Sequence, residues 1–313
     1  PEVYIVALPA FGIVSDLISV HSRKNIFGYR MMVWAIVGIG ALSFFVWAHH
    51  MYMTGMGTVI SAFFQTTTLL ISIPSVIILT CLFISLWGGS IRFNTPMLFA
   101  LAWLPMFGIG GLTGLPLGFN FSDVALHDSY YVIAHFHYVV APGTIFAIFA
   151  GVYYWYPKMT GRIMSEFWGR VHFWSSLIFM NLIFMPMFAQ GMAGMSRRMS
   201  DGGATYSLAN PDNADAGGAL SDTIMGLNVS ISAAAWAMLL AQIPFIINLF
   251  WSVKYGKKVE SDNPWRATTL EWETPTPPPH GNFTKEIKVY RDPYEYSVPG
   301  AKEDFTPQAQ PSR

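Results

Sequence analysis

The stretch HDSYYVIAHFHYVVAPGTIFAIFAGVYYWYPK, residues 127–158, decides the fold. Between Tyr130 and Trp155 it holds no Asp, Glu, Lys or Arg. A helix needs about 20 predominantly apolar residues to cross a bilayer, so this run is long enough. It also carries His135 and His137, and ionisable side chains in hydrocarbon are costly and usually functional. The stretch therefore predicts a transmembrane helix with a chemical role.

The composition of the whole chain is typical of a membrane protein. Hydrophobic residues make up 53% of the sequence and charged residues 12%, against about 25% charged residues in soluble domains. The formal net charge is zero, so we expect no nucleic-acid partner. Cys81 is the single cysteine, which excludes a disulfide framework or a cysteine-based metal centre within the chain. The expected surrounding is the lipid bilayer.

Seven segments have the length and composition of a membrane span. They are Pro1 to Val20, Met31 to His49, Ala62 to Trp87, Met97 to Leu117, Tyr130 to Trp155, Val171 to Met192 and Leu227 to Val253. The sequence thus predicts an all-α polytopic membrane protein whose helical bundle covers residues 1–253. Residues 254–313 are polar and proline-rich, and we expect them to form an extended tail on the inner face.

Lysine and arginine fall on alternate sides of these spans. One set of connections and span ends holds most of them: Arg23, Lys24, Arg30, Arg92, Lys158, Arg162, Arg170, Lys254, Lys257 and Lys258. The other set holds Arg197 and Arg198. By the positive-inside rule the first set is cytoplasmic or its topological equivalent.

The histidines of the second and fifth spans share one depth. His49 and His50 lie near the outer end of the second span, and His135 and His137 lie in the outer half of the fifth. Residues two apart on an α-helix differ by about 200°, so His135 and His137 must point to nearly opposite faces. This arrangement suits two large cofactors on either side of one helix, for instance two haems with axial imidazoles.

His49 and His50 are adjacent and would differ by about 100° on an α-helix. Both can then converge on one ion when a third ligand comes from a neighbouring helix, and imidazole suits copper, iron or zinc. The alternative for either pair is a hydrogen bond between helices without any metal. The common depth of the two pairs favours a cofactor site.

The segment before the fifth span places Asp123, His127 and Asp128 at the outer surface. The pair of His127 and Asp128 could hold a hard cation such as Mg2+, although a hydrogen-bonded turn explains the same residues. Arg197 and Arg198 would suit carboxylates such as haem propionates, or they are solvated loop charges.

Glu2 is a carboxylic acid in the first span and is suited to passing protons, with a structural hydrogen bond as the alternative. Tyr4 lies two residues further on. A residue immediately before Pro1 would share the helical face of Tyr4, because it lies four positions earlier.

At these residues the chain resembles subunit I of the haem-copper oxidases, a family of cytochrome c oxidases and quinol oxidases. The motifs that carry the resemblance are PEVY (1–4), WAHHMY (47–52), GGLTG (110–114), HDSYYVIAHFHY (127–138), GMSRRMSD (194–201) and TLEW (269–272) followed by PPP (277–279). The resemblance implies that the seven spans are the last seven of a twelve-helix bundle. The chain begins at Pro1 without an initiator Met or a leader, and we expect it to be truncated or split.

The resemblance implies a binuclear centre. The family carries a histidine directly before PEVY, which would be the third CuB ligand, linked covalently to Tyr4, with His49 and His50 as the other two. His135 would be the proximal ligand of the high-spin haem and His137 an axial ligand of the low-spin haem, both haems being of the a type.

The resemblance also implies roles for the polar residues. Glu2 would be the proton-transfer carboxylate of the centre. The others would serve at the outer side: His127 and Asp128 as Mg2+ ligands beside a second subunit, and Arg197, Arg198 and Asp123 as contacts of the haem propionates.

The implied activity is that of a terminal respiratory oxidase, which reduces O2 to water and pumps protons, in a bacterial inner membrane. The implied partners are the N-terminal half of subunit I, a CuA-bearing subunit II, subunit III and cytochrome c. Asp128 in HDSYY, together with HFHY, favours cytochrome c as electron donor over quinol. The rivals are a quinol oxidase, a nitric oxide reductase, which Tyr4 disfavours, and a non-catalytic membrane subunit or transporter, which would not need these histidines.

One position departs from the family pattern. The family usually has a lysine four residues after the proline of the third span, on a second proton path to the tyrosine. Here Pro74 is followed at that spacing by Ile78, and the span contains no lysine. Ser75 and Thr80 could carry a water chain instead, or all protons could pass Glu2; both routes stay open.

Overall fold

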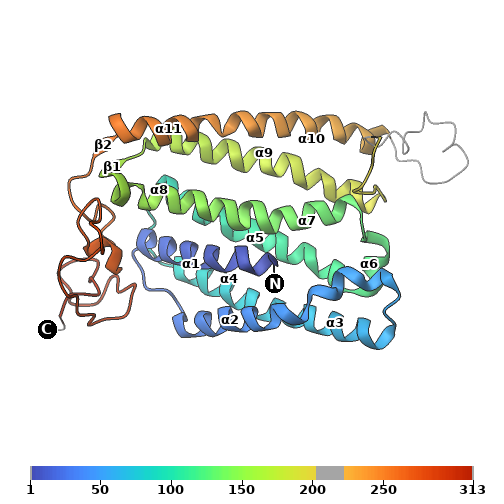
Figure 1. Cartoon of the computed structure of the whole chain (residues 1–313), viewed down its shortest axis with the longest axis horizontal. Coiled ribbons are helices and arrows are strands. Elements are labelled where there is room, and N and C mark those ends of the chain that lie inside the picture. Colours follow the sequence, from blue (N-terminus) through green and yellow to red (C-terminus); the bar gives the residue numbers. More distant parts are fainter. Residues whose placement is uncertain (1, 202–221, 312–313) are drawn as a thin grey trace, which may run out of the picture.

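The computed structural model describes residues 2–201 and 222–311. In these residues, seven helical stretches are long and apolar enough to cross a membrane: Glu2–Ser22, Tyr29–Thr54, Thr58–Leu86, Thr95–Gly118, Tyr130–Thr160, Glu166–Met192 and Thr223–Tyr255. Figure 1 shows them side by side in one bundle. The predicted all-α membrane fold is confirmed. Pro1, where the first expected span begins, lies outside the described residues, as does residue 313, where the expected tail ends.

Three of the spans are single α-helices: α1 (Glu2–Ser22), α5 (Thr95–Gly118) and α9 (Glu166–Met192). The other spans are built from consecutive segments. These are α2 (Tyr29–Leu42) with the 3₁₀ turns η1 (Ser43–Phe45) and η2 (Trp47–Thr54), α3 (Thr58–Leu70) with α4 (Ser72–Leu86), α7 (Tyr130–Val140) with the π-turn η3 (Ala141–Phe146) and α8 (Ala147–Thr160), and α10 (Asp222–Ala241) with α11 (Ile243–Tyr255). The shorter elements are α6 (Asn120–Leu126), β1 (Arg162–Ile163), β2 (Lys257–Lys258) and the 3₁₀ turn η6 (Leu270–Glu273).

Proline lies at or just after three of these interruptions. Pro74, Pro142 and Pro244 each lack the N–H that would continue the helical ladder, and each ring crowds the carbonyl four residues earlier. At the π-turn a neighbouring helix contributes a further bond, since Trp103 Nε1 of α5 donates to the Gly143 carbonyl at 2.6 Å. The three breaks therefore follow from the positions of proline in the sequence.

The two ends of the bundle differ in charge as expected. The inner end holds the connections 23–28, 87–94 and 161–165 together with residues 256–311, and the outer end holds residues 55–57, 119–129 and 193–201. At the inner end β1 pairs antiparallel with β2, with Arg162 opposite Lys258. Most of the basic residues therefore lie at the inner end, and Arg197 and Arg198 lie at the outer end.

Close helix contacts fix the helices that carry the site. A Cβ atom on Gly191 of α9 would lie 1.9 Å from the backbone nitrogen of Tyr131 in α7, so only glycine allows this approach. A Cβ atom on Gly110 of α5 would lie 2.9 Å from Val139 Cγ2 and 3.0 Å from its backbone nitrogen. The two glycines hold α7 tightly between α5 and α9.

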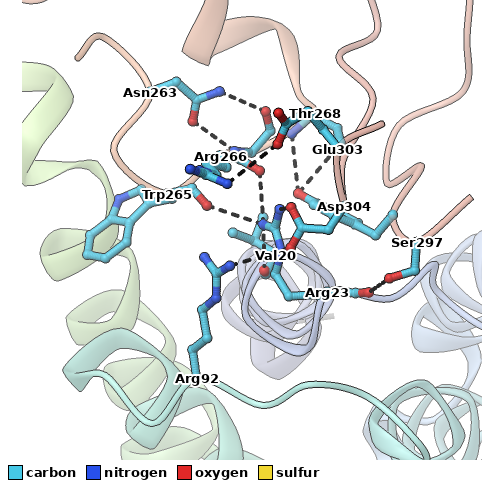
Figure 2. Close-up of polar contacts among 12 residues, drawn as sticks. Val20, Arg23, Arg92, Asn263, Trp265, Arg266, Thr268, Ser297, Glu303 and Asp304 are labelled. Carbon is cyan, nitrogen blue, oxygen red and sulfur yellow. Dashed lines mark hydrogen bonds and ion pairs between the residues drawn. The ribbon is translucent and has the colours of Figure 1, made fainter. Parts of the chain in front are cut away.

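Residues 259–311 fold back over the inner end of the bundle and do not extend away from it (Figure 1). Their anchor is Arg23 at the end of α1, whose side chain is 2% exposed and forms a two-pronged ion pair with Asp304 at 2.6 and 2.8 Å. The same guanidinium donates to the carbonyls of Trp265 and Arg266, as Figure 2 shows, and lies 4.7 Å from the centre of the Tyr296 ring. One arginine thus ties three stretches of the tail to α1.

We expect acid to loosen this tail. The Arg23 guanidinium lowers the pKa of Asp304 below its ordinary value of 3.8, so its stabilising contribution is present above that value and is lost as the pH falls through the lower folded value. Asp304→Asn should loosen the tail at neutral pH as well, by about 1–3 kcal/mol, because the buried guanidinium loses its charged partner. Limited proteolysis of the tail measures both effects. The exposed Asp292→Asn is the control, and equal cleavage of the two variants would contradict the role of the ion pair.

Candidate functional site

His49 and His50 lie on the 3₁₀ turn η2 near the outer end of the bundle. The sequence predicted that these two residues lie on an α-helix, about 100° apart, and this prediction was wrong. α2 ends at Leu42, and in the 3₁₀ turn that follows consecutive residues differ by about 120°. The tighter turn is held at its start by Thr67, whose hydroxyl donates to the Phe45 carbonyl at 2.7 Å. The two imidazoles nevertheless converge, with 3.0 Å between His49 Nε2 and His50 Nε2.

The convergent nitrogens fit a shared metal ion. Imidazole–metal bonds of about 2.0–2.1 Å, the length seen for zinc, place two nitrogens around one ion at such a separation. His49 Nδ1 lies 3.0 Å from the Thr68 hydroxyl, which orients the ring, as a second partner does for most metal-bound histidines. His135 is within electrostatic range of both histidines. Among the described residues no three His, Cys, Asp or Glu side chains form a metal site by themselves.

His135 of α7 points toward α5. Its Nδ1 lies 2.9 Å from the Gly110 carbonyl and 3.3 Å from the Thr113 hydroxyl. A Cβ atom on Gly114 would lie 2.6 Å from His135 Cε1, so the ring occupies the space that a larger residue would fill. With Nδ1 engaged by the backbone, Nε2 is the nitrogen left for a ligand.

His137 points away from α5, toward α9. Its ring stacks on Phe184 with centroids 4.2 Å apart and an interplanar angle of 14°, and its Nδ1 lies 2.8 Å from the Ile133 carbonyl. The two histidines of α7 therefore face different helices, the geometry that their spacing requires. Each leaves Nε2 as the nitrogen available for axial ligation.

Glu2 and Tyr4 lie at the start of α1. Glu2 is exposed, Tyr4 is half-buried, and Tyr4 packs against the main hydrophobic core. Glu2 is within electrostatic range of His50, which brings the acid to the histidine pair.

The outer loop forms a network around Asp128. Arg197 Nε lies 2.9 Å from one carboxylate oxygen of Asp128, and Arg198 lies 3.7 Å from the other. The Arg197 backbone N–H also donates to the Asp128 carbonyl at 2.8 Å. The two arginines expected to meet propionates thus already share one protein carboxylate.

His127 lies between two acids, 3.6 Å from Asp123 and 3.7 Å from Asp128. These are ion-pair distances and too long for hydrogen bonds. Burial raises the pKa of Asp123, an effect that the neighbouring His127 partly offsets, and Asp123 Oδ2 has no hydrogen-bond partner among the described residues. The expected magnesium ligands His127 and Asp128 are together, but Asp128 is paired with arginine.

Ile78 is fully buried in the hydrophobic core, so no ionisable group stands at the position where the family usually has lysine. The Ser75 hydroxyl donates to the carbonyl of Ile71, four residues earlier, at 3.1 Å.

The candidates drawn from the sequence left out His172 and Asp16, two ionisable residues inside the spans. His172 of α9 is a satisfied core histidine, with Tyr153 at 3.2 Å and Gln242 at 3.1 Å. Asp16 of α1 is 6% exposed, and its Oδ1 has no hydrogen-bond partner among the described residues. The signal for Asp16 was present, since a lone acid in an apolar run is unusual.

A seven-span bundle with paired histidines on η2 and oppositely directed histidines on α7 defines a class of membrane redox protein. The family model for cytochrome c and quinol oxidase polypeptide I matches residues 1–253, and the chain belongs to this family. It is 51% identical over 313 residues to the alternative cytochrome c oxidase subunit 1 of Bradyrhizobium diazoefficiens, covering 99% of this chain and 51% of that protein. It is 43% identical over 298 residues to cytochrome c oxidase subunit 1 of Synechocystis, covering 95% of this chain and 51% of that protein.

The fold has a solved counterpart in a heme-copper terminal oxidase dimer. The TM-score is 0.72 at 18% identity, over 82% of this chain and 48% of that one. The chain spans about half the length of the curated relatives it matches. Family membership implies haem and copper as cofactors and a multi-subunit membrane complex.

Proposed function

We propose that the chain is the carboxy-terminal part of the catalytic subunit of a terminal oxidase that takes electrons from cytochrome c, reduces O2 to water and pumps protons. The observation that carries the proposal is the convergence of His49 and His50 to 3.0 Å between their Nε2 atoms, with His135 close by. A pair of histidines serving only as a bridge between helices would not need His135 beside it.

The donor set fits the cofactors. His49 and His50 would hold copper, His135 the high-spin haem and His137 the low-spin haem, with haem a type expected for both. When bound, these groups supply the electrons and the binding site for O2. The missing copper ligand and the second axial ligand of the low-spin haem would come from the N-terminal half of the subunit.

The chain's own residues hold the ligands and the protons. Thr68 and the Gly110 carbonyl engage Nδ1 of His49 and His135, which leaves Nε2 of each ring facing the site. The Tyr4 phenol can give up its hydrogen at the site, and Glu2, within reach of His50, can hold a proton before delivering it.

At the outer side, Arg197 and Arg198 would bind haem propionates in addition to Asp128, because a guanidinium has several donors. Asp123 can meet a propionate only if one of the two acids is protonated, and the raised pKa of Asp123 supports that arrangement. His127 and Asp128 would hold Mg2+ with further oxygen ligands from subunit II.

Large apolar side chains on the bundle surface support burial against lipid or partner subunits. Trp34 is 74% exposed, Val59 82% and Leu112 68%. We place the complex in a bacterial inner membrane, with CuA-bearing subunit II and subunit III as neighbours.

Metal and haem content tests the proposal. The purified complex should contain two haems and one CuB per copy of this chain, besides any CuA in subunit II. Non-haem iron in place of copper would indicate a nitric oxide reductase, and absence of haem would indicate a non-catalytic subunit. Turnover with quinol but not with reduced cytochrome c would replace the proposed donor.

A further inference from the structure

A buried acid, Asp16, lies toward the inner end of α1, away from the site histidines, which lie on η2 and α7. Asp16 is 6% exposed, and the hydroxyl of Tyr154 of α8, which is 0% exposed, lies within reach of a long hydrogen bond to the Asp16 carboxylate. Yet Asp16 Oδ1 and the Tyr154 hydroxyl both lack a hydrogen-bond partner among the described residues. Two complementary polar groups therefore lie close together without a hydrogen bond of ordinary length and angle.

Further polar atoms around Tyr154 are unsatisfied in the same way. His21 Nε2 and Trp272 Nε1 have no hydrogen-bond partner in the described part of the chain, although His21 is 1% exposed and Trp272 2% exposed. Their rings lie 5.8 and 5.1 Å from the Tyr154 ring. The unpartnered atoms therefore come from α1, α8 and η6 and gather around one tyrosine.

Leaving a buried polar group without a partner costs about 1–3 kcal/mol, so several such groups in one place would strongly destabilise the fold. Buried water relieves this cost when two to four polar partners surround it. Asp16, Tyr154, His21 and Trp272 offer both acceptors and donors, which is the mixture that water requires.

Glu271 of η6 connects the cluster to solvent. It is half-buried, accepts a hydrogen bond from Trp155 Nε1 at 3.4 Å and is within electrostatic range of Asp16. Tyr294 and Tyr296 of the tail are also within electrostatic range of Asp16. The charged and titratable groups around Asp16 are thus a second acid and tyrosines.

We propose that Asp16, Tyr154 and Glu271 form a hydrated site that exchanges protons with the inner aqueous phase. Water bonds to Asp16 Oδ1 and the Tyr154 hydroxyl, and Glu271 relays protons between bulk water and this water. A proton adds to the Asp16 carboxylate as one leaves the water chain, and the step reverses without any other reactant. The tail, which carries Glu271, is held to the end of α1 by the ion pair of Arg23 with Asp304, which Figure 2 shows.

Infrared difference spectroscopy of the intact complex tests the exchange. A change of bulk pH should change the carboxylic-acid C=O band of Asp16, and transfer to D2O should shift that band. Asp16→Asn, which keeps the size of the side chain, should abolish the signal. Glu271→Gln should slow the deuterium shift at least about tenfold.

Glu273→Gln is the matched control, since Glu273 lies in the same turn but is exposed. An unchanged infrared signal in Asp16→Asn, or equal slowing by both glutamine variants, would overturn the proposal. A high-resolution map of the complex gives an independent check: water between Asp16 and Tyr154 supports the site, and a direct side-chain bond with no water overturns it. Neither readout requires turnover, so both stand apart from the proposed oxidase activity.

Discussion

Replacing His49 with alanine is expected to abolish O2 consumption by the complex. The substitution removes one of two nitrogens that lie 3.0 Å apart, and His50 with one further ligand would leave copper with too few imidazoles. We expect loss of copper, measured as metal per complex, and loss of turnover with reduced cytochrome c. The low-spin haem spectrum should stay nearly native, because His137 lies on another helix and stacks on Phe184.

Two further variants serve as a milder substitution at the same site and as a control. Thr68→Val removes only the partner of His49 Nδ1 and should weaken copper binding by about 10- to 100-fold, the usual effect of losing such a partner. His280→Ala changes an exposed histidine of the tail and should leave both metal content and turnover native. Normal O2 consumption in the His49 variant would refute the assignment of the copper site.

The helices were predictable because their cause is local. Hydropathy and length place a span without knowledge of its neighbours, and the seven stretches of the structure overlap the seven expected ones. The observed helix ends differ from the expected ones where a contact with another segment extends the helix. α9 begins at Glu166, five positions before the expected Val171, because the Glu166 carboxylate accepts hydrogen bonds from the Thr95 backbone N–H and hydroxyl at 3.0 and 2.9 Å.

The site was only partly predictable. The opposite directions of His135 and His137 follow from helix period alone. The 3₁₀ geometry of His49 and His50 depends on Thr67 capping the Phe45 carbonyl from another helix, which no local pattern reveals. Asp128 and Arg197 are about seventy positions apart, and each had another expected partner: Mg2+ for Asp128 and a haem propionate for Arg197. The sequence therefore did not predict that they pair with each other.

The inner end was the least predictable part. A polar, proline-rich tail is compatible with an extended chain. Its folding back rests on contacts with distant segments, such as the ion pair of Asp304 with buried Arg23 and the bond from Lys158 Nζ to the Thr274 carbonyl. Asp16 was overlooked for a related reason: its neighbours Tyr154 and Glu271 come from distant segments, and only the fold shows that they meet.

Replacing Gly114 with alanine is expected to remove or misplace the haem that we propose His135 binds, and to lower turnover at least about 100-fold. The new Cβ atom would lie 2.6 Å from His135 Cε1, 3.3 Å from Nε2 and 3.4 Å from Nδ1. The imidazole cannot simply rotate away, because its Nδ1 is held by the Gly110 carbonyl at 2.9 Å. Overpacking of this kind costs about 1–3 kcal/mol, and a displacement of about 1 Å at a reacting centre can cost 100-fold in rate.

Gly111→Ala is the matched control, since it lies on the same helix and a Cβ atom there meets nothing within 4 Å. Both variants add the same methyl group and gain the same helix propensity, so only the contact with His135 separates them. Optical spectra should show an altered high-spin haem in Gly114→Ala alone, with the low-spin haem retained in both. Native spectra and turnover in Gly114→Ala would mean that His135 moves freely, and its role as the proximal ligand would then be untenable.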